Sequence, residues 1–413
     1  MNDVSYILLA LSSIMFFGIF AEFLFKRTGL PDILFLLFFG IILGEFGLGI
    51  IKPSDFVIIS PVFTTFTLLF LLYDGAFNID LQSLSKSIKK SIGVTFYFFL
   101  VSCFLVTGFM TLIGYPILTS LLVGFTLGGI SSAFVVPIVK QLKVSSETYS
   151  VLTLESAFTD VLCIVSAIAV AKLITLETLE FQFALSQIVS LFAVGAFVGT
   201  LFAWGWIVIV VKFFNKNKPY MLTIACLMLT YFFADYFGGN GAIASLSFGL
   251  VLRNSSSLSE IVYRISTNNF DRPLTEKGIS ITTAEEEFFY NQLSFILKTF
   301  FFVYVGSLIN FSEVRFLLIG IALSCILFLA RKTGFLIMPK DILDFDSKII
   351  RAVFARGLAA AAIAQILILD NIPFASDIAS IVYVVILGTI ILSSFEIFFI
   401  LRRSNVIKQA VLS

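Results

Sequence analysis

Apolar residues lie along this chain in long runs separated by short polar segments, a pattern typical of helices that cross a lipid bilayer. A helix needs roughly 20 apolar residues to span the hydrocarbon. The pattern therefore predicts an all-α polytopic membrane protein with about thirteen transmembrane helices. The predicted spans are residues 4–25, 31–50, 56–78, 91–113, 116–139, 147–173, 184–212, 219–237, 240–252, 288–309, 314–338, 346–369 and 376–401. The ninth span is short, and we expect it to pair with the eighth.

Basic residues divide unequally between alternate loops. Cytoplasmic loops of membrane proteins carry an excess of Lys and Arg. One alternating set of loops holds 22 basic residues, whereas the opposite set holds Lys52, Lys172 and Arg315. This asymmetry predicts a multi-pass protein of the cell membrane with its N-terminus outside and its C-terminus in the cytoplasm. The polar stretch 253–287 then becomes a cytoplasmic loop, either regulatory or a simple solvated connection.

Composition argues against several other classes of protein. Hydrophobic residues make up 59% of the chain and charged residues 13%, and the net charge of +1 does not suit a nucleic-acid surface. The four cysteines fall inside predicted spans at unrelated spacings, so neither a disulfide framework nor a zinc site is indicated. The chain has no histidine, so any proton that it carries must bind a carboxylate. We expect no enzyme activity, no cofactor and no nucleic-acid partner.

The predicted spans fall into two halves around the seventh. Residues 1–173 contain spans one to six, residues 174–218 contain the seventh as a linker, and residues 219–413 contain spans eight to thirteen. Corresponding spans are seven apart, so the second half enters the membrane in the opposite orientation. This is the arrangement of an inverted repeat in secondary transporters.

Two spans at matching positions of the halves carry interruptions. Gly128, Gly129, Ser131 and Ser132 lie in the middle of the fifth span, and Arg356 is followed by a glycine in the middle of the twelfth. Glycine and exposed hydroxyls allow a helix to break where it lines a cavity. Paired broken helices indicate a transport site at the membrane midplane. The alternative for the fifth span is close helix packing through its small residues.

Carboxylates inside predicted spans are the candidates for ion binding, because a charge at bilayer depth is costly and faces a protein interior or a wet cavity. Asp160 in the sixth span is the candidate for binding either a cation or a proton. Ser156 shares its helix face, and Glu155 and Thr159 share the neighbouring face. Asp74 and the hydroxyl or carbonyl of Ser131 offer further oxygens, although Asp74 is alternatively an interfacial residue.

Two basic residues, Lys298 and Arg356, also lie near the middle of predicted spans, and each needs a carboxylate partner. Because Glu155 lies on the face that neighbours that of Asp160, we interpret it as the structural counter-ion of Arg356. The hydroxyl of Thr159 is expected to bond either Glu155 or the backbone of its own helix.

Six segments resemble successive signatures of the monovalent cation/proton antiporter superfamily, the sodium/proton exchangers, over nearly the whole chain. They are LLFLLYDGAFNID, GGISSAFVVPIVK, ESAFTDVLCIV, FFADYFGGNGAIASLSFGLVLRN, KTFFFVYVGSLI and RAVFARGLAAAAIAQIL. The resemblance implies two inverted six-helix repeats with interrupted, crossing helices. It also implies a homodimer, in which helices 4–6 and 11–13 form a mobile core and the remaining helices form a dimer domain, with transport by an elevator-like swing.

The resemblance also assigns roles to individual residues. Asp160 would be the ion-binding aspartate, with Asp74 and Ser156 as co-ligands and Ser131 near the helix crossing. Thr159, Ser132, Glu155, Arg356 and Lys298 would support the site, with Glu155 and Arg356 as a buried pair. Thr159 stands where the family has Asn or Asp, which favours one proton per cation, whereas Lys298 is a feature of the charge-moving branch. The stoichiometry stays open.

The predicted function is secondary antiport of a monovalent cation for protons, in the service of pH homeostasis. Na⁺ is the first choice of cation, with K⁺ and Li⁺ as alternatives, and cation and proton compete for Asp160. A gated monovalent cation channel or a potassium efflux pathway is the alternative, since both also use buried charges and broken helices.

Overall fold

The structure is a computed structural model that describes residues 3–51, 59–77, 88–142, 144–176, 181–213, 220–255, 284–336 and 344–403. Every regular element within these ranges is a helix, and none of them contains a strand. The predicted all-α class is therefore confirmed. Most of the predicted cytoplasmic loop 253–287 lies outside the described residues.

The chain forms two compact units, which we describe separately. The large unit comprises Met1–Thr65, Ser87–Leu179 and Ile296–Ser413, and the small unit comprises Phe66–Lys86 and Glu180–Phe295. Two helices contribute residues to both units: α3 (Ser60–Phe77) and α13 (Ala284–Ser307).

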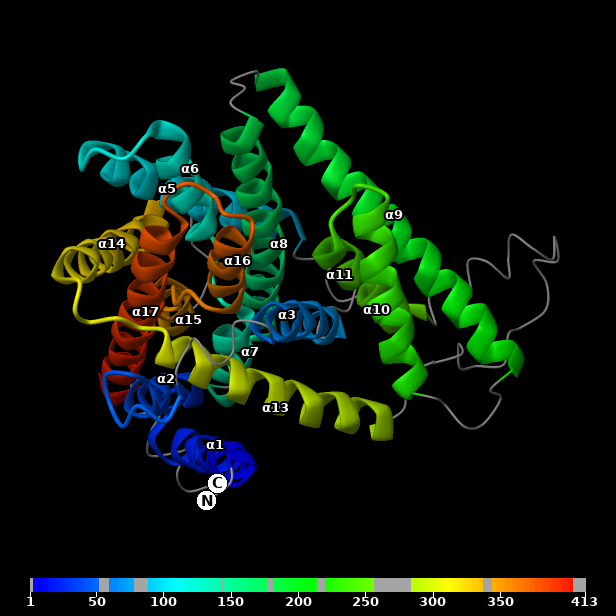
Figure 1. The fold of residues 1–413 in the computed structure, drawn as a ribbon, viewed down its shortest axis with the longest axis horizontal. Coiled ribbons are helices and arrows are strands. Elements are labelled where there is room, and N and C mark those ends of the chain that lie inside the picture. The colour runs from blue at the N-terminus through cyan, green and yellow to red at the C-terminus, as the bar shows by residue number, and fades with distance from the viewer. Residues whose placement is uncertain are drawn as a thin grey trace. The chain divides into compact units, whose positions relative to one another are not determined.

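The remaining α-helices, which Figure 1 labels, each belong to one unit. Those of the large unit are α1 (Asp3–Thr28), α2 (Asp32–Leu43), α5 (Ile88–Leu112), α6 (Ile117–Thr126), α7 (Ser132–Leu142), α8 (Ser146–Leu176), α14 (Val314–Lys332), the short 3₁₀ helix η2 (Thr333–Leu336), α15 (Asp344–Ala352), α16 (Leu358–Leu369) and α17 (Ala375–Arg403). Those of the small unit are α9 (Phe181–Phe213), α10 (Tyr220–Tyr236) and α11 (Gly241–Arg253).

Helix length and apolar composition agree with a multi-pass membrane protein. Seven of the described helices are long and apolar enough to cross a bilayer, and six shorter apolar helices accompany them. Each predicted span coincides with one helix or with two shorter helices in succession. The number of membrane crossings and the inverted repeat stay predictions.

Both predicted interruptions are present. Residues 127–131 separate α6 from α7, and residues 353–357 separate α15 from α16. The first break lies close to α8, because a Cβ atom at Gly129 would be 2.8 Å from both the Thr159 Cβ and the Cys163 Sγ. Glycine at this position therefore permits an approach that a larger residue would prevent.

Helix α8 is the most enclosed of the seven long helices. Of its apolar window 72% is buried, against 22 to 44% for the other six. It packs against α5, α6, α7 and α16 within the large unit. A polar side chain on almost any face of α8 is thereby surrounded by protein, which places its carboxylates away from lipid.

Small residues mediate close helix contacts, as expected for membrane helices. In the large unit the Cβ position of Gly40 lies against the backbone of Val303 and Gly306, so α2 and α13 touch there. In the small unit Gly199 of α9 lies against the backbone of Ala244. Helix α11 also packs on α10, which confirms the predicted pairing of the eighth and ninth spans.

Candidate functional site

The two helix breaks of the large unit meet through their backbones. The Ser131 N–H donates to the Ala355 carbonyl oxygen at 2.9 Å. Opposite Ser131 lies Gly357, and the Ser131 hydroxyl and Cβ occupy the space that a Cβ atom at Gly357 would need. Ser131 thus lies at the crossing of the two broken helices, where its hydroxyl is buried and has no hydrogen-bond partner among the described residues.

Asp160 lies on α8 beside this crossing. Its side chain is 4% exposed, and its Oδ2 accepts a hydrogen bond of 2.7 Å from the hydroxyl of Ser132. Ser132 is the first residue of α7. Backbone N–H groups at a helix N-terminus carry partial positive charge, which favours a carboxylate there. The break therefore presents an anion-stabilising helix end to Asp160, the carboxylate that we predict to bind either a cation or a proton.

Arg356, which lies in the second break, binds backbone carbonyls of the first break. Its Nη1 donates to the carbonyl oxygens of Gly128, at 3.3 Å, and Gly129, and its Nη2 donates to the Ser102 hydroxyl at 3.0 Å. These carbonyls follow the last turn of α6, where the helix dipole is negative. The guanidinium thus satisfies backbone acceptors that would be costly to leave unpaired inside a membrane.

Glu155 is paired with Arg331, so the prediction that it pairs with Arg356 was wrong. Arg331 binds both carboxylate oxygens, and Glu155 and Arg331 are 1% and 3% exposed. Arg331 was one of the 22 basic residues counted as cytoplasmic, near the end of the predicted span 314–338. The structure places it in the last turn of α14, where it is buried. The interpretation of Glu155 as a structural counter-ion agrees with this geometry, with a different arginine.

Thr159 bonds backbone rather than Glu155. Its hydroxyl donates to the Ser156 carbonyl oxygen at 3.3 Å and accepts from the Ile130 N–H at 3.1 Å. The second contact fastens the unwound backbone of the first break to α8. Of the two alternatives for Thr159, the structure supports the bond to its own helix and adds one that the sequence did not indicate.

Ser156 is fully buried, and its hydroxyl donates to the Thr153 carbonyl oxygen at 3.0 Å. No hydrogen bond between Ser156 and Asp160 occurs among the described residues. The hydroxyl oxygen keeps lone pairs that are able to face a cation. Its role as a co-ligand stays a prediction.

Lys298 has the carboxylate partner that its position in a span requires. Its Nζ lies 2.5 Å from the Oδ2 of Asp32, and the two side chains are 16% and 5% exposed. Our sequence interpretation overlooked Asp32, which directly follows Pro31 at the start of the second predicted span. A carboxylate at the first position of an apolar helix was the signal that would have identified it.

Asp74 belongs to the small unit, where its Oδ2 accepts a hydrogen bond of 2.7 Å from the Ser294 hydroxyl. This contact is polar and half-buried rather than exposed at a helix end. Its role as a second ion ligand stays a prediction.

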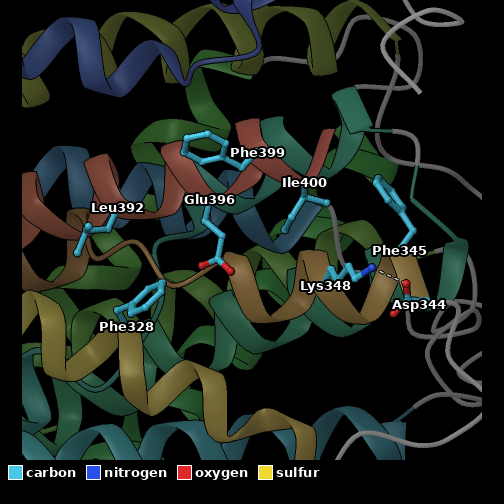
Figure 2. Close-up of a pocket in the computed structure, with 8 residues that line it drawn as sticks. All are labelled: Phe328, Asp344, Phe345, Lys348, Leu392, Glu396, Phe399 and Ile400. Carbon is cyan, nitrogen blue, oxygen red and sulfur yellow. Dashed lines mark hydrogen bonds and ion pairs between the residues drawn. The ribbon is translucent and has the colours of Figure 1, made fainter. Parts of the chain in front are cut away.

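A separate cavity of ≈ 570 Å³ lies among α14, α15 and α17. Figure 2 shows its aromatic lining and the Lys348 to Asp344 ion pair at one end. It is lined by Phe328, Asp344, Phe345, Lys348, Leu392, Glu396, Phe399 and Ile400, none of which is a predicted ligand. Within the described part of the chain no group of three or more His, Cys, Asp and Glu side chains is arranged to hold a metal ion.

These features define a multi-pass membrane protein with charged and hydroxyl side chains gathered around two crossing, broken helices. The chain belongs to the sodium/hydrogen exchanger family, whose transmembrane profile matches residues 11–403. The predicted family resemblance is thus confirmed. A comparison with curated proteins gives no match.

The fold is similar to that of the sodium proton antiporter MjNhaP1 from Methanocaldococcus jannaschii. Its structure at pH 8 has a TM-score of 0.71 and 21% identity, with 99% of each chain covered. An electron-microscopy structure of the same antiporter has a TM-score of 0.70 and 20% identity, covering 100% of this chain and 98% of that one. The predicted sodium/proton antiporter fold is confirmed.

Proposed function

We propose that this protein is a secondary active antiporter that exchanges a monovalent cation, Na⁺ in the first place, for protons. Cation and proton compete for Asp160, and the site opens alternately to the two sides of the membrane. The observation that carries this proposal is the Asp160 carboxylate, buried in α8 and bonded by Ser132 at the start of a broken helix. Family membership and the antiporter fold support it.

Competition at Asp160 follows from the chemistry of a carboxyl group. The ionised carboxylate offers two oxygens to a cation, whereas the protonated acid offers a donor and attracts a cation poorly. The Ser132 hydroxyl, which donates to the ionised group, also has oxygen lone pairs that are able to turn toward a bound cation. Asp74, Ser156 and Ser131 are the proposed additional oxygen ligands, and K⁺ or Li⁺ are the alternative cations.

The moving part in this proposal is a core made of the fourth to sixth and the eleventh to thirteenth predicted spans. The remaining spans form the contact between the two subunits of a homodimer. Two contacts support a core that moves as one body. The buried Glu155 to Arg331 ion pair ties α8 to α14, and Arg356 ties the second break to the first. The proposal retains the orientation from the loop charges, with the N-terminus outside and the C-terminus in the cytoplasm.

Exchange in proteoliposomes tests the proposal. An imposed Na⁺ gradient should drive protons the opposite way, and this coupling should persist when the membrane voltage is clamped. Conductance without obligatory exchange would instead indicate the channel alternative. Asp160→Asn should abolish exchange while the protein remains folded. Asp235→Asn, which alters an exposed carboxylate on α10, is the matched control and should exchange normally.

A further inference from the structure

Polar side chains recur at every fourth position along α13, which is otherwise rich in apolar residues. They are Glu286, Tyr290, Ser294 and Lys298. Residues four apart lie on one face of a helix. The first three of these positions fall in the small unit, and the apolar span of α13 begins at Phe288, two residues after Glu286. A polar face therefore starts at the end of the span and runs into it.

The side chains on this face are hydrogen-bonded and well enclosed. The Tyr290 hydroxyl donates to the Oε1 of Glu286 at 2.7 Å, and the Ser294 hydroxyl donates to the Oδ2 of Asp74 at 2.7 Å. Glu286 is 4% exposed and Tyr290 is 1% exposed. A buried polar group costs free energy unless it is hydrogen-bonded, and replacing both partners of a buried hydrogen bond by apolar groups of the same shape is nearly neutral or stabilising. Stability alone therefore does not require polar side chains on this face, which points to a role beyond packing.

Helix α3 supplies the opposite wall of this polar face. Tyr73 is fully buried, with its ring centroid 5.4 Å from that of Tyr290 and the rings nearly perpendicular. Asp74 follows it in sequence and accepts the bond from Ser294. Helix α10 contributes Tyr220, whose ring lies 5.2 Å from that of Phe289. Two carboxyl groups thus stand at the ends of a short path with phenol and alcohol hydroxyls between them.

We propose that Glu286 and Tyr290 relay protons between the cytoplasmic face and Asp74. This inference rests on the proposed antiport and adds to it the cytoplasmic part of the proton route, as far as the proposed co-ligand Asp74. Glu286 lies at the end of the stretch 253–287, which the loop charges assign to the cytoplasm. The chain has no histidine, so carboxyl groups are the side chains that take up protons in the neutral range.

The relay conserves protons and requires no redox partner. Glu286 takes a proton from cytoplasmic water and gives it to the Tyr290 oxygen. At the same time the Tyr290 hydroxyl releases its own proton toward Ser294. One helical turn, about 5–6 Å, separates Tyr290 from Ser294, a gap that one water molecule bridges. The Ser294 hydroxyl passes its proton to Asp74 and receives one from that water. Each side chain except Asp74 then returns to its starting protonation state, and one proton has moved from the cytoplasmic water to Asp74.

Two transport modes separate a proton route from a structural role. Exchange of Na⁺ for H⁺ needs the relay, whereas exchange of labelled Na⁺ for unlabelled Na⁺ at equal pH moves no net proton. Both are measured with the full-length protein in proteoliposomes. In Glu286→Gln we expect Na⁺/H⁺ exchange to fall about a hundredfold, at the low end for a lost proton-transfer group, with Na⁺/Na⁺ exchange unchanged. Tyr290→Phe, which removes a single oxygen atom, should show the same split.

Glu285→Gln is the matched control, because Glu285 is the neighbouring carboxylate and is exposed. It should preserve both modes. Normal Na⁺/H⁺ exchange in Glu286→Gln and Tyr290→Phe would overturn the relay, and so would an equal loss of both modes, which indicates structural damage or a cation path. If Glu286→Gln does not fold, Tyr290→Phe decides alone by the same criteria. Failure of the antiport proposal looks different, since wild-type protein would then show no Na⁺/H⁺ exchange.

Discussion

Arg331 binds both oxygens of the Glu155 carboxylate, with Nη2 2.8 Å from Oε2, inside the large unit. Its Nε donates to the Ile350 carbonyl oxygen at 2.8 Å, and its guanidinium lies 3.9 Å from the centroid of the Phe98 ring. One side chain of α14 therefore connects α8, α15 and α5. Charge-assisted, two-point hydrogen bonding of this kind fixes geometry as well as adding energy. The pair holds the helices that surround Asp160.

Arg331→Ala should destabilise the protein by about 3–5 kcal/mol, because it leaves Glu155 as an unpaired charge in a buried site. Thermal unfolding of the purified protein measures this loss. The double variant Arg331→Met with Glu155→Gln removes both charges and should recover part of it. Lys26→Ala is the control, since its ion pair with Glu22 is largely exposed and contributes about 0–1 kcal/mol. Equal stability of Arg331→Ala and wild type would show that the pair does not stabilise the core.

Thr159→Val should weaken the attachment of the first helix break to α8. Valine has a similar shape but no oxygen, so the Ile130 N–H loses its acceptor inside the membrane. An unsatisfied buried donor costs about 1–3 kcal/mol. Thr159→Ser keeps the oxygen and should retain most of the stability. If both variants unfold at the same temperature as wild type, the hydrogen bond between Thr159 and Ile130 does not stabilise the folded protein.

The architecture was largely predictable from the sequence, because the signals that specify it are local. Runs of apolar residues long enough to span a bilayer mark the helices, and glycine followed by hydroxyl residues marks the first break. Arg356 and the glycine after it, within an apolar run, mark the second break. The partners of Arg356 were not marked in this way, because its guanidinium binds carbonyls of the first break.

The pairing of charges was not predictable in the same way. The sequence offers Glu155 two arginines, Arg331 and Arg356. Which of them it binds depends on how α14 packs against α8, and no local sequence pattern encodes that packing. Asp32 was overlooked because it stands at a span boundary, where an isolated carboxylate is usually solvated. The bond from Ile130 to Thr159 joins residues of two spans, so only the packed structure reveals it.

Gly357→Ala should disturb the crossing of the two broken helices. The added Cβ would overlap the Ser131 side chain, and relief requires the two backbones to separate. Overpacking of this kind costs about 1–3 kcal/mol. We expect a lower unfolding temperature together with a large loss of Na⁺/H⁺ exchange, because Ser131 precedes the residue that bonds Asp160.

Gly108→Ala is the matched control for Gly357→Ala. Gly108 lies in α5 with open space around its Cβ position, and alanine there should raise stability by roughly 1 kcal/mol through helix propensity. The double variant Ser131→Gly with Gly357→Ala removes the side chain that the new Cβ would overlap. It should therefore be more stable than Gly357→Ala alone. If the single variant Gly357→Ala is as stable and active as wild type, the close contact of the two breaks is not required.

Ser132→Ala tests whether the helix break tunes the affinity of Asp160 for its cation. The variant removes the hydroxyl that lies 2.7 Å from the carboxylate but keeps the backbone of α7. A hydrogen bond to a charged group contributes about 1.5–3 kcal/mol, so the KM for Na⁺ should rise roughly tenfold or more, with a smaller change in the maximal rate. Ser132→Thr keeps the hydroxyl and should stay near wild type. The control is Ser150→Ala, whose hydroxyl donates to its own helix at Ser146. An unchanged KM in Ser132→Ala would show that the bond seen between Ser132 and Asp160 is not part of the cation site, even if Asp160 itself proves essential.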